Sequence, residues 1–428
     1  MTVSKGTIFD IIYKTMIFLA VFDSIRHYSI ISSYITRIKE VLVIALFVSA
    51  LHLKKYFLDK KFFNIPMILF FSYLILILPI TVYLNTPIYH MFNLEGDNIH
   101  YGYAIYYKIF QFIFILIIFY SYEDITKKKY EKLIKFFINA TIIFILFNIV
   151  AYFVHLPIMD KFRPFPERIS SGYPTMDAQM IAVALLANLY IVIHNSIFKK
   201  MVKSFILMFG LIMQATGTGI VSFITLIFFY IIFNRKYDKD IRRSNDYTII
   251  SAFFLIVVLV LFLNFFYYEY ISMTINIFIR KFLFLILGFS TEYDVSLMVR
   301  ASQLEEVLAQ QTNWFDKIFG IGTFLGSNIE NQFNLIRASF GIIGLLLFIV
   351  LFIYFIAFSL RNFDENGKIL FLTIVLFGFT SYTLLTLYLI TIEISYSLIF
   401  IYCILKINKK KEFLNYSLLK KELGFNTN

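Results

Sequence analysis

Arginines stand in two long stretches between the apolar segments of this sequence. Arg163 and Arg168 lie in the first stretch, Arg300 lies in the second, and Arg337 directly follows the second. An arginine side chain stays protonated and offers a planar fork of N–H donors, which suits a diphosphate better than lysine does. These residues predict a site for an anionic ligand. The alternative for any one of them is contact with lipid headgroups or pairing with a nearby Asp or Glu.

The first stretch, residues 156–176, is predicted to be a rigid loop. Three prolines and a glycine restrict or turn its backbone: Pro164, Pro166, Pro174 and Gly172. Such a loop would present Arg168, Tyr173 and Asp177 where the next apolar segment begins. The alternative is a stiff lid that contacts no ligand.

The second stretch, residues 269–336, is far longer than a connection between two helices needs to be. Apolar residues recur at helical spacing around Arg300, at Leu297, Leu304, Val307 and Leu308. This pattern predicts an amphipathic helix that lies along a membrane interface. Long loops on one face of a membrane protein favour recognition or chemistry on that face.

Glycines and an acid follow near the end of the second stretch. Gly320 and Gly322 indicate a flexible turn, and Glu330 stands at the start of the next apolar segment. Gly341 and Gly344 lie inside that segment, where small residues allow helices to approach closely. For this second pair we expect packing rather than chemistry.

The elements that must position these side chains are membrane-spanning helices. Of the 428 residues, 60% are hydrophobic and 15% are charged, whereas an average soluble chain carries about 25% charged residues. This composition excludes a soluble globular enzyme, a disordered chain and a nucleic-acid-binding module. Because a spanning helix needs about 20 mostly apolar residues, we expect one all-α integral membrane domain over 1–428. Its twelve spans are expected at 7–22, 40–53, 64–84, 103–122, 134–155, 177–195, 203–215, 218–234, 248–268, 337–360, 369–385 and 388–405.

Basic residues predict the orientation of these spans. They concentrate in six segments, at 54–61, 123–136, 196–203, 234–243, 361–368 and 406–428. With twelve spans all six segments fall on one side, which is the cytoplasm because cytoplasmic loops are rich in Lys and Arg. Both termini are then cytoplasmic, and the two arginine-bearing stretches are outside. The tail 406–428 is amphipathic and is expected to lie on the inner membrane surface.

The sequence carries no recognisable metal site. Cys403 is the single cysteine, and the six histidines show no spacing typical of metal ligands. We therefore expect neither a metal nor another cofactor.

Several motifs in a fixed order resemble those of one family. They are Arg168-Ile-Ser-Ser-Gly-Tyr-Pro-Thr-Met-Asp177, the break Thr216-Gly-Thr-Gly219, Ser296-Leu-Met-Val-Arg300, Gly320-Ile-Gly322, Glu330-Asn-Gln-Phe333 and Gly341-Ile-Ile-Gly344. Together they resemble the Wzy-type polysaccharide repeat-unit polymerases of the O-antigen ligase/polymerase superfamily. The resemblance covers about 160–350 by motif and the whole chain by topology.

The resemblance implies a GT-C-like membrane fold and a lipid-linked glycosyl transfer without a metal or nucleotide sugar. The enzyme would polymerise undecaprenyl-diphosphate-linked repeat units into O-antigen, capsular or exopolysaccharide at the outer face of the bacterial inner membrane. Undecaprenyl diphosphate would be the leaving group. The partners implied are the donor and acceptor glycans, the lipid bilayer and a chain-length regulator protein.

The same resemblance suggests roles for individual residues. Arg168 and Arg300 match the two outer-loop arginines of the family and would hold the diphosphate. Glu330 stands where the ligase branch has a histidine, which makes it the candidate base or hydroxyl-orienting group, with Asp177 as the second choice. Further substrate-binding candidates are Arg163, Arg337, Tyr173 and Asp177. Glu393, inside the last span, is costly to bury there, and we assign it no role.

Three alternatives stay open. An O-antigen ligase would share the fold, but the missing histidine disfavours it. A flippase or other transporter of lipid-linked oligosaccharides would place its cations within the spans rather than in outer loops. A membrane scaffold without enzymatic activity would leave the outer arginines without a purpose.

Overall fold

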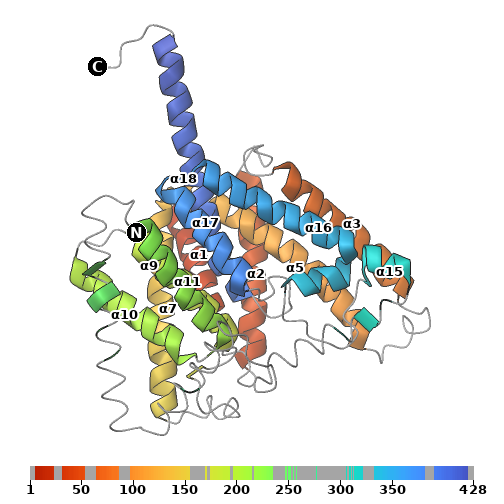
Figure 1. The fold of residues 1–428 in the computed structure, drawn as a ribbon, viewed down its shortest axis with the longest axis horizontal. Coiled ribbons are helices and arrows are strands. Elements are labelled where there is room, and N and C mark those ends of the chain that lie inside the picture. The colour runs from red at the N-terminus through yellow and green to blue at the C-terminus, as the bar shows by residue number, and fades with distance from the viewer. Residues whose placement is uncertain are drawn as a thin grey trace.

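The structure is a computed structural model that describes most of the chain. The described residues are 5–23, 31–53, 64–85, 97–154, 169–170, 174–192, 196–214, 216–234, 246–247, 249–251, 254, 257, 276, 305, 308–309, 311, 313–321, 332–380 and 390–422. All regular elements in these ranges are helices (Figure 1), which confirms the all-α prediction for this part of the chain.

The helices follow one another with short connections over much of the chain. They are α1 Lys5–Val21, α2 Ile31–Leu53, α3 Ile65–Asn85, α5 Asp97–Tyr120, α6 Tyr122–Thr126, α7 Tyr130–Phe153, α9 Pro174–Tyr190, α10 Ile197–Met213, α11 Gly217–Asn234, α15 Trp314–Phe319, α16 Gln332–Arg361, α17 Glu365–Thr380 and α18 Ile390–Glu422. Eleven of the twelve expected spans coincide with one of these helices. The remaining one, 248–268, lies almost wholly outside the described residues.

Three helical segments in the described part are long and apolar enough to cross a membrane. They are Tyr130–Phe153, Phe333–Arg361 and Thr391–Lys411. Several other expected spans are too short by this measure, because α1, α9 and α10 have 17 residues each and α17 has 16. A full crossing takes about 20 residues. The structure therefore fits a helical membrane protein, and the part of the chain that it describes holds three such segments rather than twelve.

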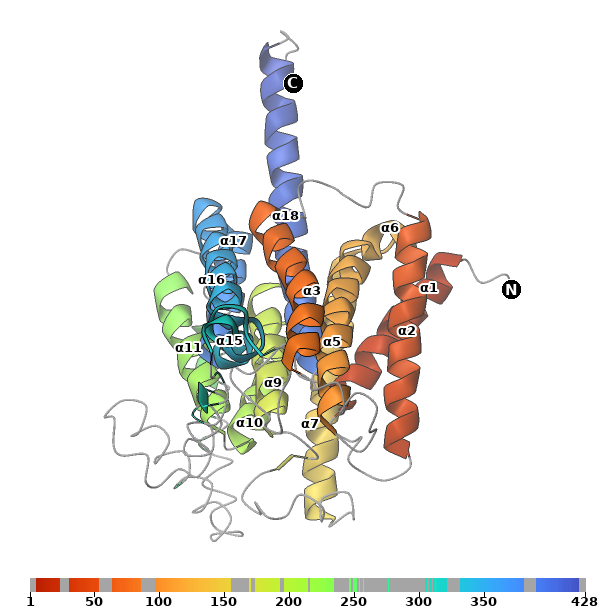
Figure 2. The ribbon, with the colours of Figure 1, turned by 90° about the vertical axis from the view of Figure 1, so that its right-hand side faces the viewer.

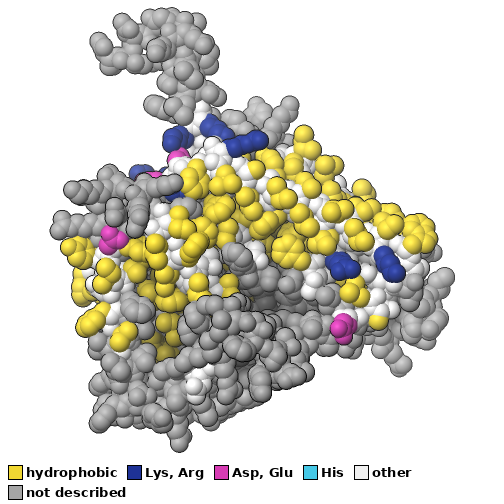
Figure 3. Space-filling model, in the orientation of Figure 1, with side chains coloured by type: hydrophobic (Ala, Val, Ile, Leu, Met, Phe, Trp, Pro, Cys, Tyr) yellow, Lys and Arg dark blue, Asp and Glu magenta, His cyan; other side chains and the backbone are white. Residues whose placement is uncertain are grey.

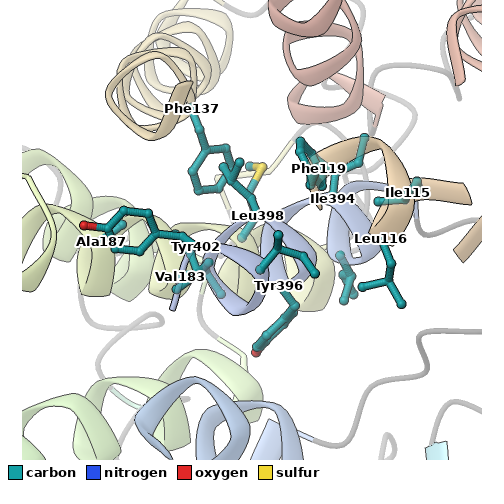
Figure 4. Packing of buried hydrophobic residues seen from close by; sticks show 14 of the residues in the cluster. Ile115, Leu116, Phe119, Phe137, Val183, Ala187, Ile394, Tyr396, Leu398 and Tyr402 are labelled. Atoms are coloured by element: carbon teal, nitrogen blue, oxygen red, sulfur yellow. The ribbon is translucent and has the colours of Figure 1, made fainter. Parts of the chain in front are cut away.

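Helix α18 runs through the middle of the bundle and packs on α1, α5, α9 and α17. Figure 4 shows Leu398 and Tyr402 of α18 among side chains from other helices, including Phe119 of α5, Phe137 of α7 and Val183 of α9. Helix α9 is buried on all sides from Met176 to Leu189. A helix that is apolar all round is stable only in such a central position.

Apolar side chains also cover the outside of the bundle. Val41 on α2, Leu76 on α3 and Val350 on α16 are all exposed. Figure 3 shows hydrophobic side chains spread over α3 and α16 as one broad area. A water-soluble monomer rarely exposes so large an apolar patch, so this surface suits lipid.

The tail continues α18 instead of turning along the bundle. The helix runs unbroken to Glu422 and its last part projects from the bundle in Figures 1 and 2. The helix is unbroken because no Gly or Pro occurs between Ile390 and Glu422 to end it. Residues 423–428 lie outside the described residues, and contact of the tail 406–428 with the inner membrane surface stays a prediction.

Candidate functional site

A buried carboxyl marks the beginning of α9. The helix starts at Pro174, a residue type suited to the first helical position. Asp177 lies in the first turn, where the helix dipole favours negative charge, and it is fully buried. The Ser170 hydroxyl donates a hydrogen bond to Asp177 Oδ2 at 2.6 Å. The sequence-predicted Asp177 is therefore held in place from the loop that precedes its helix.

The end of α10 fixes this loop. The Ile169 N–H donates to the Met213 carbonyl at 3.2 Å, and the Ile169 carbonyl accepts from Gln214 Nε2 at 3.0 Å. The Ile169 side chain packs with Phe209 and Met213. Ile169, joined to the end of α10 by two hydrogen bonds, thus leads directly into Ser170.

The predicted Thr/Gly break lies beside the same carboxyl. Helices α10 and α11 are separate, as expected, and Thr216 Oγ1 accepts from the Gly219 N–H at 3.0 Å, which caps α11. A Cβ added to Gly219 would lie 3.5 Å from Cβ of Ala178, the residue after Asp177. Helix α11 therefore begins against the first turn of α9.

Two further buried amides belong to α9 and α7. Gln179 of α9 is fully buried, Asn148 of α7 is 1% exposed, and α7 packs on α9. Neither side-chain amide has a hydrogen-bond partner among the described residues. Buried amides without partners are costly in a purely structural core.

The polar residues joined to the start of α9 are Ser170, Asp177, Gln214 and Thr216. We name these four residues the α9 cluster.

The α9 cluster can bind and orient a hydroxyl group. It offers a carboxyl, an amide and two hydroxyls, and none of its four side chains carries a positive charge. The carboxyl can accept a hydrogen bond or a proton, and the amide group can donate to an oxygen. No group of three or more His, Cys, Asp or Glu suited to a metal occurs among the described residues.

A second junction lies where α16 is interrupted. Gly341 has φ 66° and ψ −167°, so the helix breaks there. The carbonyls that lose their helical partners at the break accept hydrogen bonds from groups outside the helix. Ala338 O accepts from the Ile321 N–H at 3.0 Å, and Phe340 O accepts from the Tyr73 hydroxyl at 2.9 Å. The break is thus held by α3 and by the segment that follows α15.

The two predicted glycine motifs meet at this break. A Cβ on Gly341 would lie 2.1 Å from the Ile318 carbonyl oxygen, and a Cβ on Gly320, which has φ 86°, would lie 2.4 Å from the Phe340 nitrogen. The backbones therefore pack directly on each other. The expectation of close packing at Gly341 is confirmed, and its partner is the end of α15. The predicted turn extends to Gly322, which lies outside the described residues, so its flexibility stays a prediction.

The sequence-predicted site residues divide between these two places. Asp177 belongs to the α9 cluster. Arg337 lies half-buried on the first part of α16, and its carbonyl accepts from Gln311 Nε2 at 3.5 Å. The other candidates fall outside the described residues: Arg163, Arg168, Tyr173, Arg300 and Glu330.

Sequence reasoning missed a buried ion pair. Lys39 Nζ of α2 donates to Asp23 Oδ1 after α1, and the two side chains are 2% and 0% exposed. The expected second span started at 40, whereas α2 starts at Ile31, which places Lys39 inside the bundle. The sequence signal for this pair was Lys39, a charged residue directly before an expected span. Glu393, which the sequence did single out, is also fully buried.

Basic segments gather where α18 leaves the bundle. Lys409 of α18 pairs with Glu123, and Lys410 pairs with Asp364. Burial alone would raise the pKa of Asp364, but hydrogen bonds from Lys410 and the Gly367 N–H outweigh it and hold the pKa below its ordinary value of 3.8. These pairs join the tail to the basic segments 123–136 and 361–368, and Figure 3 shows Lys and Arg side chains at this end.

The comparisons with known proteins give no family. Neither a protein-family model nor a curated protein matches this sequence. The class defined by the structure itself is an all-α protein whose apolar helices fit a membrane.

Proposed function

We propose that this chain is a glycosyltransferase that polymerises undecaprenyl-diphosphate-linked oligosaccharide repeat units. The product would be O-antigen, capsular or exopolysaccharide, made at the outer face of the bacterial inner membrane. The proposal builds on the motif resemblance, and one observation of the structure supports it. Motifs far apart in the sequence meet in pairs.

The pairing involves four of the six motifs. The Ser170–Asp177 region adjoins Gln214 and the Thr/Gly break, and Gly320 packs on Gly341. Two helix interruptions and two loop ends are thus fixed in space by contacts between the motifs themselves. Rigid support of this kind is what a site needs to hold reacting groups in position. The loops that carry the candidate arginines lead out of these two junctions.

In the proposed reaction the acceptor hydroxyl oxygen forms a bond to the anomeric carbon of the donor. The bond between that carbon and undecaprenyl diphosphate breaks, and the hydroxyl proton passes to a carboxylate, with Glu330 as first choice and Asp177 as second. Arg168 and Arg300 would stabilise the charge that develops on the leaving diphosphate. The substrate-binding candidates are Arg163, Arg337, Tyr173 and Asp177.

The proposed topology has twelve crossings in a GT-C-like arrangement with both termini in the cytoplasm. It is supported by the helices found at eleven expected spans. It is also supported by the location of three basic segments at the same end of the bundle. Helices shorter than about 20 residues can cross where the bilayer thins locally or where flanking side chains reach the interface.

The test uses purified protein in lipid vesicles with lipid-diphosphate-linked repeat units and no nucleotide sugar. We expect a ladder of polymers from the unchanged protein. Arg300→Ala should lower the rate of ladder formation by about 10²–10³-fold, as loss of one charge-stabilising group does in other enzymes. Arg361→Ala, at the last turn of α16, is the matched control and should keep the rate.

Other outcomes would contradict parts of the proposal. A rate for Arg300→Ala equal to that of Arg361→Ala would remove the role of Arg300. Single transfers of one glycan to another acceptor, without a ladder, would indicate a ligase.

A transporter of lipid-linked oligosaccharides is the second candidate function. The buried pair of Asp23 and Lys39 favours it, because charged residues inside a membrane bundle often mark a transport path. In the same vesicles a transporter would move the units between leaflets and form no new glycosidic bond.

A further inference from the structure

A partly open cavity of about 130 Å³ lies between α3, α5, α16, α17 and α18. Nine of its fifteen lining residues are aromatic, among them Phe70, Phe112, Phe352, Phe377, Tyr396 and Phe400. In Figure 4 the ring of Tyr396 points away from the side chains packed around Leu398. The wall is almost entirely hydrocarbon.

A space of this size is unusual because protein interiors are close-packed. Atoms that line an empty apolar void lose contacts on one side. Water needs two to four polar partners, and the wall offers few, since the Thr373 hydroxyl is already bonded to the Ile369 carbonyl at 2.7 Å. An apolar cavity of similar volume in another protein stays dry and binds benzene. This cavity accordingly suits hydrocarbon.

The surroundings of the cavity are equally apolar. Phe70 of α3 and Phe352 of α16 line it, while their neighbours Leu69 and Ile353 are exposed on the outer surface of the same helices. Helices α3 and α16 pack side by side. A hydrocarbon chain in a surrounding membrane therefore meets apolar side chains on both sides of this wall.

A long hydrocarbon chain can reach the cavity from the outer face. Tyr396 and Phe400 follow the first residue of α18, Ile390, by six and ten residues. Phe70 and Leu116 lie only five and four residues from the ends of α3 and α5 that we place in the cytoplasm. At about 1.5 Å per residue the cavity is nearer to these two cytoplasmic ends, so a chain whose headgroup lies at the outer face reaches it with its distal part.

We propose that the cavity binds part of the polyisoprenoid chain of the lipid-linked substrate. The inference rests on the proposed function and deepens it by assigning a site to the lipid part of the substrate. Methyl-branched units fill a wide aromatic cavity with more contacts than a straight chain does, because dispersion attraction grows with the number of close atom pairs.

The experiment uses full-length protein in lipid nanodiscs and two photoreactive probes. One probe is a polyprenyl diphosphate with a diazirine in the distal part of its chain. The other is a phosphatidylglycerol with a diazirine at the end of one acyl chain. Labelled peptides are identified by mass spectrometry. We expect the polyprenyl probe to label peptides of α17 and α18, and the phosphatidylglycerol probe to give background labelling only.

Two variants change the cavity in different ways. Ser397→Leu fills it with hydrocarbon and removes a buried hydroxyl that has no hydrogen-bond partner. Gly378→Ala would place a Cβ 2.6 Å from Phe352 Cζ and so displaces that ring. Both should lose the polyprenyl labelling. Val350→Leu adds one methylene on the exposed face of α16 and is the matched control that should keep it.

Labelling of Ser397→Leu at the level of the unchanged protein would overturn the inference, as would equal labelling by the two probes. If Ser397→Leu unfolds at a lower temperature than the control, the labelling of Gly378→Ala is compared with that of the unchanged protein instead. Equal labelling would then overturn the inference. Labelling does not require polymer formation. A labelled protein that forms no ladder would therefore contradict the proposed function alone, and a ladder without labelling would contradict the cavity assignment alone.

Discussion

The hydrogen bond between Ser170 and Asp177 is the most specific polar contact of the candidate site. Both residues are buried, and the serine is the only described residue between Ile169 and Pro174. A buried carboxyl needs such a partner because an unsatisfied oxygen loses its water without compensation. The contact orients Asp177 whichever role the carboxyl has in the reaction.

Ser170→Ala should lower the free energy of unfolding by about 1–3 kcal/mol, because it removes a hydrogen bond from a buried carboxyl. Denaturant titration of the purified protein in mixed micelles measures this change. Ser49→Ala is the matched control, since the exposed Ser49 hydroxyl bonds only to the Ala45 carbonyl of its own helix. Equal stability of the two variants would mean that Ser170 does not hold Asp177.

The break in α16 is the main feature at the scale of elements. Without it the helix would run straight through Gly341, and the carbonyls of Ala338 and Phe340 would bond within the helix. The structure instead bonds them to Ile321 and Tyr73. Interrupted helices in membrane proteins are tolerated where the freed backbone groups find other partners, and here α3 and the segment after α15 supply them.

Gly341→Ala should destabilise the protein by at least about 2 kcal/mol. The backbone of Gly341, with φ 66° and ψ −167°, costs a residue with a side chain about 1–3 kcal/mol, and the new Cβ would lie 2.1 Å from the Ile318 carbonyl oxygen. The yield of folded protein and its denaturant titration measure the effect. Leu346→Ala, exposed on the same helix, should change stability far less. A Gly341→Ala variant as stable as this control would show that the helix is not broken there.

At the scale of the whole molecule, charge and hydropathy separate the surface into regions. The sides of the bundle are apolar, and basic residues gather at the end where α18 leaves. This division is typical of a protein whose basic end faces the cytoplasm. Helix α7, one of the three helices that qualify as spans, connects that end to Phe153 at the other.

Single cysteines test this orientation with little background, because the native Cys403 is buried. Val154→Cys, directly after α7, should react with a membrane-impermeant maleimide in intact cells. Lys127→Cys, shortly before α7, and Asn362→Cys, between α16 and α17, should react only after the cells are permeabilised. Gel-shift of the labelled protein measures each case.

Two results would contradict the proposed topology. Labelling of Lys127→Cys and Val154→Cys from the same side would mean that α7 does not cross the membrane. Labelling of Asn362→Cys in intact cells while Lys127→Cys stays protected would mean an odd number of crossings between them.

The sequence by itself determined where helices form. Apolar runs and their polar interruptions are local properties, so they predicted helices at eleven of the twelve expected positions and the break between α10 and α11. The sequence also singled out Asp177 and Glu393 as polar residues of interest, because an acid next to or within an apolar run is costly to bury.

Only the tertiary structure decided which residues meet. The Lys39–Asp23 pair, the contact of Gly320 with Gly341 and the aromatic cavity each depend on how separate helices pack. A local sequence pattern does not identify these partners. The role of a buried polar group or of a glycine depends on the element that it contacts in the folded protein.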